Sequence, residues 1–397
     1  MIRSKIINFE WMCDYNHFNF EKFNKIKFKL VTDEINIAID KKNINTVIGL
    51  FLIDGFLPLS TRDLEFQKFL SSLDEYFKEK DINCFLISGQ GENLENSPFE
   101  YFFYDTNLRF VYNDYKNRLD KISNFNRSSK KFLFLTGVPS RPNRIGLLSK
   151  FYEKNIIKDS IWTFFPPWTT KDKKWCRSYL SHYSNEKYKI FLKLCERKLD
   201  EKYDTAQDWL GDHSEDNEET EWGEIRHTKW AKHPVYVDSS VYNETRLSVI
   251  SEGPNYWGGD WEFITEKTWR TFLHKHPFVF AGHPDQFDYI KQLGFRTFEN
   301  FLPIPDYAYI QKEDERLEAV VANTEFLLSN REYDNEIQED IDYNYYLFFE
   351  WVKKQDNFVN NLVKNYGVDR EEFDYWIGKQ TGYNNLIMEI PRRYYGN

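Results

Sequence analysis

The 397-residue chain has few cysteines, and their spacing is typical of neither a disulfide framework nor a zinc ribbon. The four form no CxxC pair and are widely separated: Cys13, Cys84, Cys176 and Cys195. This pattern favours a reducing compartment, so we expect a cytoplasmic protein. The chain also lacks an apolar N-terminal segment of the signal-peptide kind, and Asp54 and Gly55 interrupt its most apolar run, 46–59. We therefore expect no membrane span.

Several motifs for nucleotides and metals are also missing. The chain has neither GxxxxGK[ST] nor a GxGxxG that opens a helix, which argues against P-loop and dinucleotide chemistry. His274, His276 and His283 show no zinc spacing, and Asp340-Ile341-Asp342 precedes a predicted helix, whereas the DxD of metal-dependent sugar transferases follows a strand. We expect no bound metal. The net charge of −10 argues against a broad basic surface for nucleic acid, although it leaves room for one basic cleft.

The sequence does contain a regular alternation of strand-like and helix-like segments. In the first part we expect strands at 46–54, 83–88 and 108–112, with an amphipathic helix at 62–80. A second set begins with a strand at 131–137, a helix at 143–154 and a strand at 160–165. The apolar runs are continuous, as in parallel strands covered by helices on both faces, so the fold class is α/β.

A β-α-β-α-β succession follows, with segments at 247–251, 264–274, 277–281, 285–293 and 296–298. Such a succession forms half of a doubly wound sheet, in which ligands bind beyond the carboxyl ends of the strands. Apolar stripes predict further helices at 314–329 and 345–366. We expect an acceptor-side domain at 1–128, a ligand-binding domain at 129–330 and a helical tail at 331–397. An acidic insertion at about 204–230 is read as a solvated loop.

The segment from Ser248 to Gly282 combines a strand, a glycine-rich loop, a capped helix and a second strand. Thr265 is a suitable N-cap, which places Glu266 and Lys267 in the first helical turn. Unpaired backbone N–H groups and a lysine at a helix start favour an anion, most simply a phosphate. We expect Lys267 to contact a diphosphate and Glu266 to accept hydrogen bonds from ribose. The alternative is an ordinary helix start.

Other candidate residues follow neighbouring strands. Glu252 comes directly after an apolar strand, where we expect it to bind ribose or to orient Lys267. The alternative is a loop carboxylate that pairs with a nearby cation. Arg141 and Arg144 lie in the turn and first helical turn after the strand that begins at residue 131, and guanidinium groups suit phosphates. Taken alone, an arginine at such a position is more often an ordinary surface ion-pair partner.

A general base is expected in the first domain. Asp54 ends an apolar strand and is the first candidate for a catalytic base, with Glu92 and Glu95 in a later loop as competitors. The alternative for Asp54 is a plain Asp-Gly turn.

The succession LSVISEG…FITEKTWRTFLHKHPFVFAGHPDQFDYIKQLGFRTF resembles the nucleotide-binding half of fucosyltransferase-like GT-B glycosyltransferases. It is most similar to a branch common in viral and phage genomes, and the resemblance covers residues 131–330. It implies two Rossmann-like domains that face a cleft, inversion at the anomeric carbon, and no bound metal. It further implies that Lys267 and an arginine of 141–144 bind the donor diphosphate, that Glu266 holds the ribose, and that a carboxylate of the N-terminal domain deprotonates the acceptor. Fucosyltransferases usually have Phe-Glu-Asn where this chain has Ser251-Glu252-Gly253, which leaves the donor sugar open.

Three functions are compatible with these features. The first is a glycosyltransferase that moves a sugar from a nucleotide-diphosphate sugar to an acceptor hydroxyl on a glycan. The second is a viral DNA-base glycosyltransferase acting on a hydroxymethylated pyrimidine, which needs a basic, aromatic groove and would work in the host cytoplasm. The third is a non-catalytic nucleotide-sugar-binding protein.

Overall fold

The computed structural model describes two compact units of mixed α/β structure. The first comprises Met1–Phe110, Gly258–Phe263 and Glu350–Asn397, and the second Val111–Trp257 and Ile264–Phe349. Within them, the residues described are 4–8, 32–33, 35–37, 44–51, 64–88, 99–135, 142–157, 160–163, 237, 239–252 and 264–374. No helix in these ranges is both long and apolar enough to cross a lipid bilayer.

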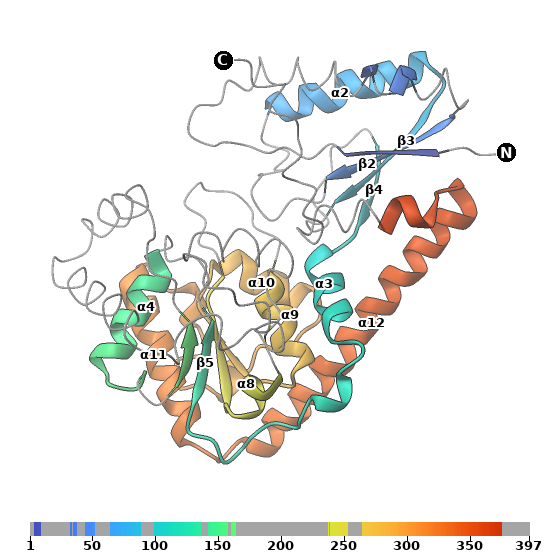
Figure 1. Ribbon diagram of the computed structural model, residues 1–397. Coiled ribbons are helices and arrows are strands. Elements are labelled where there is room, and N and C mark those ends of the chain that lie inside the picture. The colour runs from blue at the N-terminus through green and yellow to red at the C-terminus, as the bar shows by residue number, and fades with distance from the viewer. Residues whose placement is uncertain are drawn as a thin grey trace, which may run out of the picture. The chain divides into compact units, whose positions relative to one another are not determined.

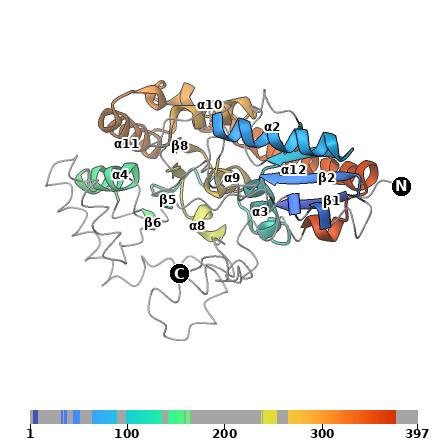
Figure 2. The same cartoon turned by 90° about the horizontal axis from the view of Figure 1, so that it is seen from above.

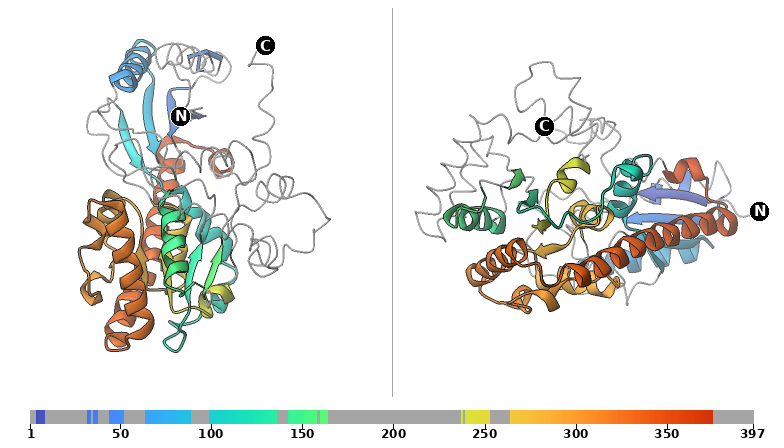
Figure 3. Two further views of the ribbon diagram at one scale, coloured as in Figure 1. Left: turned by 90° about the vertical axis from the view of Figure 1, so that its left-hand side faces the viewer. Right: turned by 90° about the horizontal axis from the view of Figure 1, so that it is seen from below.

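The limits of the two units differ from the domains expected from sequence. The segment 111–128 belongs to the second unit, not to the first. The expected tail is divided as well, because helix α12 (Asp334–Tyr366) contributes residues to both units. Figure 3 shows α12 as one continuous helix, which begins at Asp334, whereas the sequence predicted a start near residue 345.

The first unit contains a four-stranded parallel sheet. Its strands β1 (Ser4–Asn8), β2 (Thr46–Phe51), β3 (Asn83–Ser88) and β4 (Glu100–Phe103) are hydrogen-bonded in that order. Helix α2 (Leu64–Glu79) connects β2 to β3 and lies along the sheet (Figure 1). Its buried residues Leu70, Leu73 and Phe77 recur at helical spacing, so one face of α2 packs inward.

The sequence wrongly predicted a strand at 108–112, which is part of helix α3 (Thr106–Tyr115). Leu108, Val111 and Tyr115 are fully buried at spacings of three and four, a helical period that the short apolar run concealed. Asp105 stabilises the helix start, since its Oδ1 accepts a hydrogen bond of 2.8 Å from the backbone N–H of Leu108. The strand next to β3 is instead β4.

The core of the first unit joins the sheet to the C-terminal helix. Ile6, Ile48 and Ile87 come from three adjacent strands and pack in one buried cluster with Val359 and Leu362 of α12. Burial of a large aliphatic side chain stabilises by about 1.5–3 kcal/mol, so the tail residues are part of this unit's core.

The second unit contains the other parallel sheet. Its strands are β5 (Phe132–Leu135), β6 (Ile161–Thr163), β7 (Leu247–Ile250) and β8 (Phe278–Phe280), in the order β6-β5-β7-β8. Besides α3 and α12, the described residues of this unit form the α-helices α4 (Pro142–Glu153), α8 (Ser239–Asn243), α9 (Glu266–Leu273), α10 (Pro284–Gln292) and α11 (Glu313–Ser329). Short 3-10 helices lie at Leu119–Lys121, Glu299–Phe301 and Tyr307–Tyr309. Within the described residues, the order of strands and helices predicted from β5 to α11 is confirmed except at two places: α8 was not predicted, and the strand expected at 296–298 is absent.

Helix α4 packs beside α11 in the second unit, as Figures 1 and 2 show from two directions. The Nζ atom of Lys150 lies 3.0 Å from Oδ1 of Asp314 and 2.8 Å from Oε1 of Glu318, which joins the two helices by ion pairs. These contacts fix α4, and therefore the position at which it begins.

The strand expected at 296–298 does not form. The backbone of Arg296 is paired instead by the side chain of Asn344 in α12. The Arg296 N–H donates to Asn344 Oδ1, and Asn344 Nδ2 donates to the Arg296 carbonyl, both at 2.9 Å. Phe298 then adopts a left-handed conformation with φ of 64°, which ends any extended run. A side-chain amide thus takes the place of a neighbouring strand.

A buried arginine fixes the beginning of β7. Arg246 is 1% exposed, and its guanidinium donates to the carbonyls of Leu327 at 2.6 Å and Asn330 at 3.0 Å. It also forms an ion pair with Asp334. Because these acceptors lie at the end of α11 and the start of α12, β7 is held against both helices.

Candidate functional site

The strand order of the second unit defines a topological switch point. The chain passes from β5 outward to β6 on one side, and from β7 outward to β8 on the other. In open parallel sheets, the crevice beyond the carboxyl ends of the two central strands is where ligands bind. The candidate site therefore lies where α4, which follows β5, approaches the end of β7.

Two side chains in the first turn of helix α4 form hydrogen bonds to the carboxyl ends of the neighbouring strands. Asn143 Nδ2 lies 3.3 Å from Ser251 Oγ, 3.1 Å from the Glu252 carbonyl and 3.2 Å from the Ala281 carbonyl. Arg144 Nη2 donates to the Ser251 carbonyl at 3.2 Å. Asn143 and Arg144 are 5% and 4% exposed. The start of α4 is thus bound to the ends of β7 and β8.

Glu252 connects the end of β7 to α9. Its side chain is buried, and Oε1 accepts hydrogen bonds from the Thr265 backbone N–H at 3.0 Å and the Thr265 hydroxyl at 2.9 Å. A third comes from the Thr268 hydroxyl at 2.7 Å. Oε2 is also buried and has no hydrogen-bond partner among the described residues. Glu252 lies two residues beyond β7, and its hydrogen bonds fix the amino end of α9.

Thr265 is the N-cap of α9, as the sequence predicted. It has extended backbone angles, and its hydroxyl accepts a hydrogen bond from the Lys267 backbone N–H at 3.3 Å. A capping threonine typically stabilises a helix by about 1 kcal/mol. The N–H groups of Thr268 and Trp269 donate to the Thr265 carbonyl at 3.2 and 3.4 Å, which completes the first turn of α9.

Two cations flank the carboxylate of Glu266. The same oxygen, Oε1, lies 2.9 Å from Lys267 Nζ and 3.2 Å from Arg270 Nη2. Burial by itself would raise the pKa of Glu266, but the charges of Lys267 and Arg270 outweigh it and lower that pKa to about 2. Glu266 is therefore ionised at neutral pH and forms an ion pair with Lys267.

Buried aromatic and polar groups surround Arg270, the second cationic partner of Glu266. Arg270 is 1% exposed, and its positive charge lies close enough to Tyr242 of α8 to lower the pKa of that phenol against the larger effect of burial. The Tyr242 ring stacks on His274 with centroids 4.0 Å apart, and Tyr115 meets His274 edge-on at 4.6 Å. Burial raises the pKa of Tyr242 to about 12 and that of Tyr115 well above its usual value, so both phenols stay protonated.

The three histidines considered at the sequence level have identified contacts. His274 Nε2 lies 3.1 Å from Ser239 Oγ. His276 Nδ1 lies 2.7 Å from Ser248 Oγ, and its Nε2 lies 3.0 Å from the Thr245 carbonyl. His283 caps α10. Among the described residues, no three His, Cys, Asp or Glu side chains are grouped so as to hold a metal ion.

The DxD segment lies inside α12, where two of its residues form ion pairs. Asp340 pairs with Arg296, and Asp342 Oδ1 lies 3.7 Å from Lys275 Nζ. Both carboxylates are therefore engaged with cations of the second unit.

Several expected residues cannot be placed. Asp54, Arg141, the competing bases Glu92 and Glu95, the glycine-rich loop at 253–263 and the acidic insertion lie outside the described residues. Those that are described, Arg144, Glu252, Thr265, Glu266 and Lys267, lie along one continuous series of contacts.

Three contributors to the site were missed from sequence: Asn143, Thr268 and Arg270. Arg270 follows Glu266 by four residues, a spacing at which opposite charges pair on a helix, and could have been found on that ground. Asn143 follows Pro142 at the first helical position, which marks a helix start but not its partners. Nothing in the sequence distinguishes Thr268 from Thr271.

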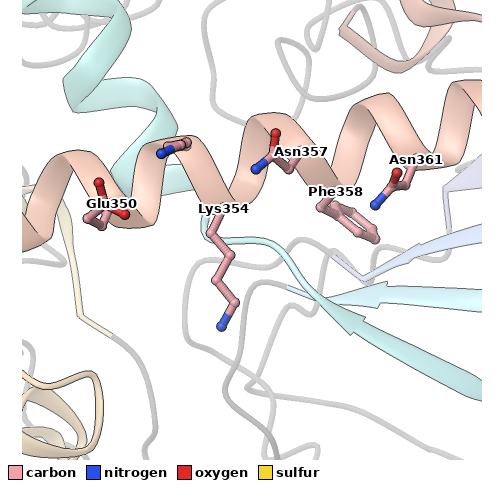
Figure 4. Close-up of a pocket in the computed structure, with 6 residues that line it drawn as sticks. Glu350, Lys354, Asn357, Phe358 and Asn361 are labelled. Atoms are coloured by element: carbon pink, nitrogen blue, oxygen red, sulfur yellow. The ribbon is translucent and has the colours of Figure 1, made fainter.

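An open pocket of about 380 Å³ lies elsewhere, on the part of α12 that belongs to the first unit. Figure 4 shows its lining residues spaced along this one helix: Glu350, Lys353, Lys354, Asn357, Phe358 and Asn361. The ammonium of Lys354 lies 4.2 Å from the centre of the Trp351 ring. All of the described lining residues come from one helix, so within the described part of the chain this pocket offers less chemistry than the switch point.

Comparisons with protein-family models, curated proteins and solved structures give no match. A proposal of function therefore rests on the sequence resemblance and on the geometry of the site.

Proposed function

We propose that the chain is an inverting, metal-independent glycosyltransferase of the GT-B class. In this proposal, two Rossmann-like domains face a cleft, and the second unit binds a nucleotide-diphosphate sugar at its switch point. The sequence resemblance supplies the reaction class, and two α/β units with parallel sheets are compatible with it. The acceptor is a hydroxyl group, on a glycan in the reading that the acidic net charge favours.

The observation that carries the proposal is a series of hydrogen bonds linking two helix starts. Asn143 and Arg144 bind the carbonyls of Glu252 and Ser251, and Glu252 binds Thr265. The amino ends of α4 and α9 therefore converge beyond β5 and β7. Each helix start carries a partial positive charge, and a diphosphate supplies two negative charges.

The proposed roles follow from position. Lys267 is in the first turn of α9 and is the cation that contacts the diphosphate, and the adjacent Glu266 carboxylate accepts hydrogen bonds from the ribose hydroxyls. Arg144 adds positive charge at the carboxyl end of β7, where its Nη2 donates a hydrogen bond to the Ser251 carbonyl. Arg141 remains the predicted second guanidinium.

The reaction requires a base and stabilisation of the leaving group. The acceptor oxygen attacks the anomeric carbon from the face opposite the nucleotide, and the bond from this carbon to the diphosphate oxygen breaks. The bonding electron pair goes to the diphosphate, where Lys267 and the arginine stabilise it. The acceptor proton passes to a carboxylate of the N-terminal domain, for which Asp54 is the first candidate and Glu92 and Glu95 are the alternatives.

Donor binding is the first test of the proposal. A panel of UDP- and GDP-sugars is screened by thermal shift, because a ligand at 100 times its Kd stabilises the folded state by about 2.7 kcal/mol. Lys267→Ala removes one charge-assisted contact of about 1.5–3 kcal/mol, so Kd should rise roughly 10- to 100-fold. Lys312→Ala is the matched control, since this lysine is also paired with a glutamate at 2.7 Å.

The possible outcomes test the assigned site and the proposed function separately. Binding that Lys267→Ala leaves unchanged would exclude the assigned site, and absence of binding to any nucleotide sugar would exclude the function. Once a donor is found, transfer to glycan acceptors and to hydroxymethylated DNA distinguishes the two enzyme hypotheses. Binding without transfer or hydrolysis would identify a non-catalytic binding protein.

A further inference from the structure

Glu266 has two cationic partners that differ in how much of their side chain is exposed. Lys267 is in the first turn of α9, and its side chain is 15% exposed. Arg270 lies one turn further along the helix, and its side chain is 1% exposed. Both reach the same oxygen of Glu266, so the carboxylate keeps one cation if the other moves away.

A lysine that binds a diphosphate must give up part of its contact with Glu266. An ammonium has three donors on a flexible stem, so Lys267 is able to reorient toward an anion. Glu266 would then be a largely buried carboxylate beside two ligand phosphates, which disfavour its charge. Unless a second cation stays in place, Glu266 would take up a proton and lose the acceptor capacity that a ribose diol requires.

The surroundings of Arg270 hold it in place. Its guanidinium faces Tyr242 of α8, and Tyr115 and Asp114 of α3 contribute to its electrostatic environment. The carbonyl of Arg270 lies 2.9 Å from His274 Nδ1. A guanidinium this deeply buried cannot follow a ligand, and arginine does not lose its proton within proteins.

We infer that Arg270 is a positioning residue for the proposed nucleotide-sugar site: its buried guanidinium keeps Glu266 fixed and ionised while Lys267 transfers from Glu266 to the diphosphate. The inference rests on the proposed function. It assigns Arg270 no contact with the substrate, and it explains why the carboxylate at this helix start has two cations when one would neutralise it.

A pH profile of donor binding tests this role. The groups facing Glu266 and Arg270 are Lys267 on α9, Tyr242 on α8, Tyr115 and Asp114 on α3, and His274 after α9. All of them are retained in Arg270→Met, and the diphosphate of a nucleotide sugar has no titrating group between pH 5 and pH 8. A difference in profile between wild type and variant therefore reports the charge at position 270.

We expect the wild-type Kd for a bound nucleotide sugar to be nearly constant from pH 8 to pH 5. For Arg270→Met, Kd should rise roughly tenfold more than for wild type over this range, because Glu266 becomes protonated. Arg270→Lys, which keeps a cation, should restore most of the flat profile. Arg296→Met, at an arginine paired with Asp340, is the matched control and should follow wild type.

The outcomes distinguish the two proposals. If wild type binds no nucleotide sugar, the proposed function fails and this inference fails with it. If wild type binds and the profile of Arg270→Met is parallel to it, only the inference is overturned. Should Arg270→Met not fold, Arg270→Gln, which removes the charge but keeps a polar group facing Tyr242, is judged by the same criterion.

Discussion

Replacement of Thr268 by valine isolates one hydrogen bond on which the geometry of the site depends. Thr268 is fully buried and donates at 2.7 Å to Glu252, which is fully buried as well. Valine keeps the shape of threonine and removes only the donor. A hydrogen bond to a charged group contributes about 1.5–3 kcal/mol, so we expect Thr268→Val to lower the free energy of unfolding by about 2 kcal/mol.

Thr271 provides a matched control on the same helix. It is 2% exposed, and its hydroxyl donates at 2.9 Å to the backbone carbonyl of Lys267, four residues earlier. This acceptor is neutral and belongs to the helix backbone. Removing such a bond is nearly neutral, so we expect Thr271→Val to change the free energy of unfolding by less than about 0.5 kcal/mol.

Urea and thermal unfolding at neutral pH measure the difference. For a unit of this size, a loss of 2 kcal/mol corresponds to a fall in Tm of about 4–8 °C for Thr268→Val, with an unchanged urea m-value. Equal stability of the two valine variants would refute the argument that Glu252 is a charged acceptor on which α9 depends. In a Glu252→Gln background, the cost of Thr268→Val should fall by about half, since the acceptor is then neutral.

Three further predictions concern pH and packing. The pKa of Glu266 is about 2 in the folded protein, below its ordinary 4.5. The ionised carboxylate therefore stabilises the fold fully above pH 4.5, and this stabilisation is lost as the pH falls toward 2. Glu266→Gln should remove about 3 kcal/mol of this pH dependence, measured by urea unfolding at each pH. Burial lowers the pKa of His276 from 6.5 to about 4. The free energy of unfolding should therefore fall by about 3 kcal/mol as the pH is lowered from 6.5 to 4. A similar fall in His276→Gln would show that His276 is not the group responsible. A Cβ at Gly282 would lie 2.5 Å from the Phe280 ring, so Gly282→Ala should destabilise by about 1–3 kcal/mol in thermal unfolding. Gly146→Ala should cost less, because the atom it meets is the flexible end of a leucine, and equal losses would argue against a rigid packing contact at Gly282.

Many elements of the second unit were predictable because their apolar segments are clearly delimited by polar residues and helix caps. The strands β5 and β8 are continuous apolar runs, β7 has a single serine among apolar residues, and the Thr265 cap marks the start of α9. The errors have physical causes. The run at 108–112 is too short to distinguish strand from helix, and the expected strand at 296–298 loses its partner to Asn344.

The site was predictable only in its local part. Thr265, Glu266 and Lys267 are neighbours in sequence, and Arg270 is one turn away, so helical geometry alone brings these groups together. The partners of Glu252 required more, because Thr265 and Thr268 lie 13 and 16 residues beyond it, across the glycine-rich loop. The contact of Asn143 with Ser251 spans 108 residues.

The sequence by itself determined the α/β class, the order of most elements and a cationic helix start at Thr265, since these follow from hydrophobic periodicity, capping and adjacent charges. Only the tertiary structure decided the strand order β6-β5-β7-β8 and the meeting of α4 with the end of β7. It also decided that Arg270 is buried beneath Glu266. Strand order and burial depend on how distant segments pack, and no local pattern of residues encodes that packing.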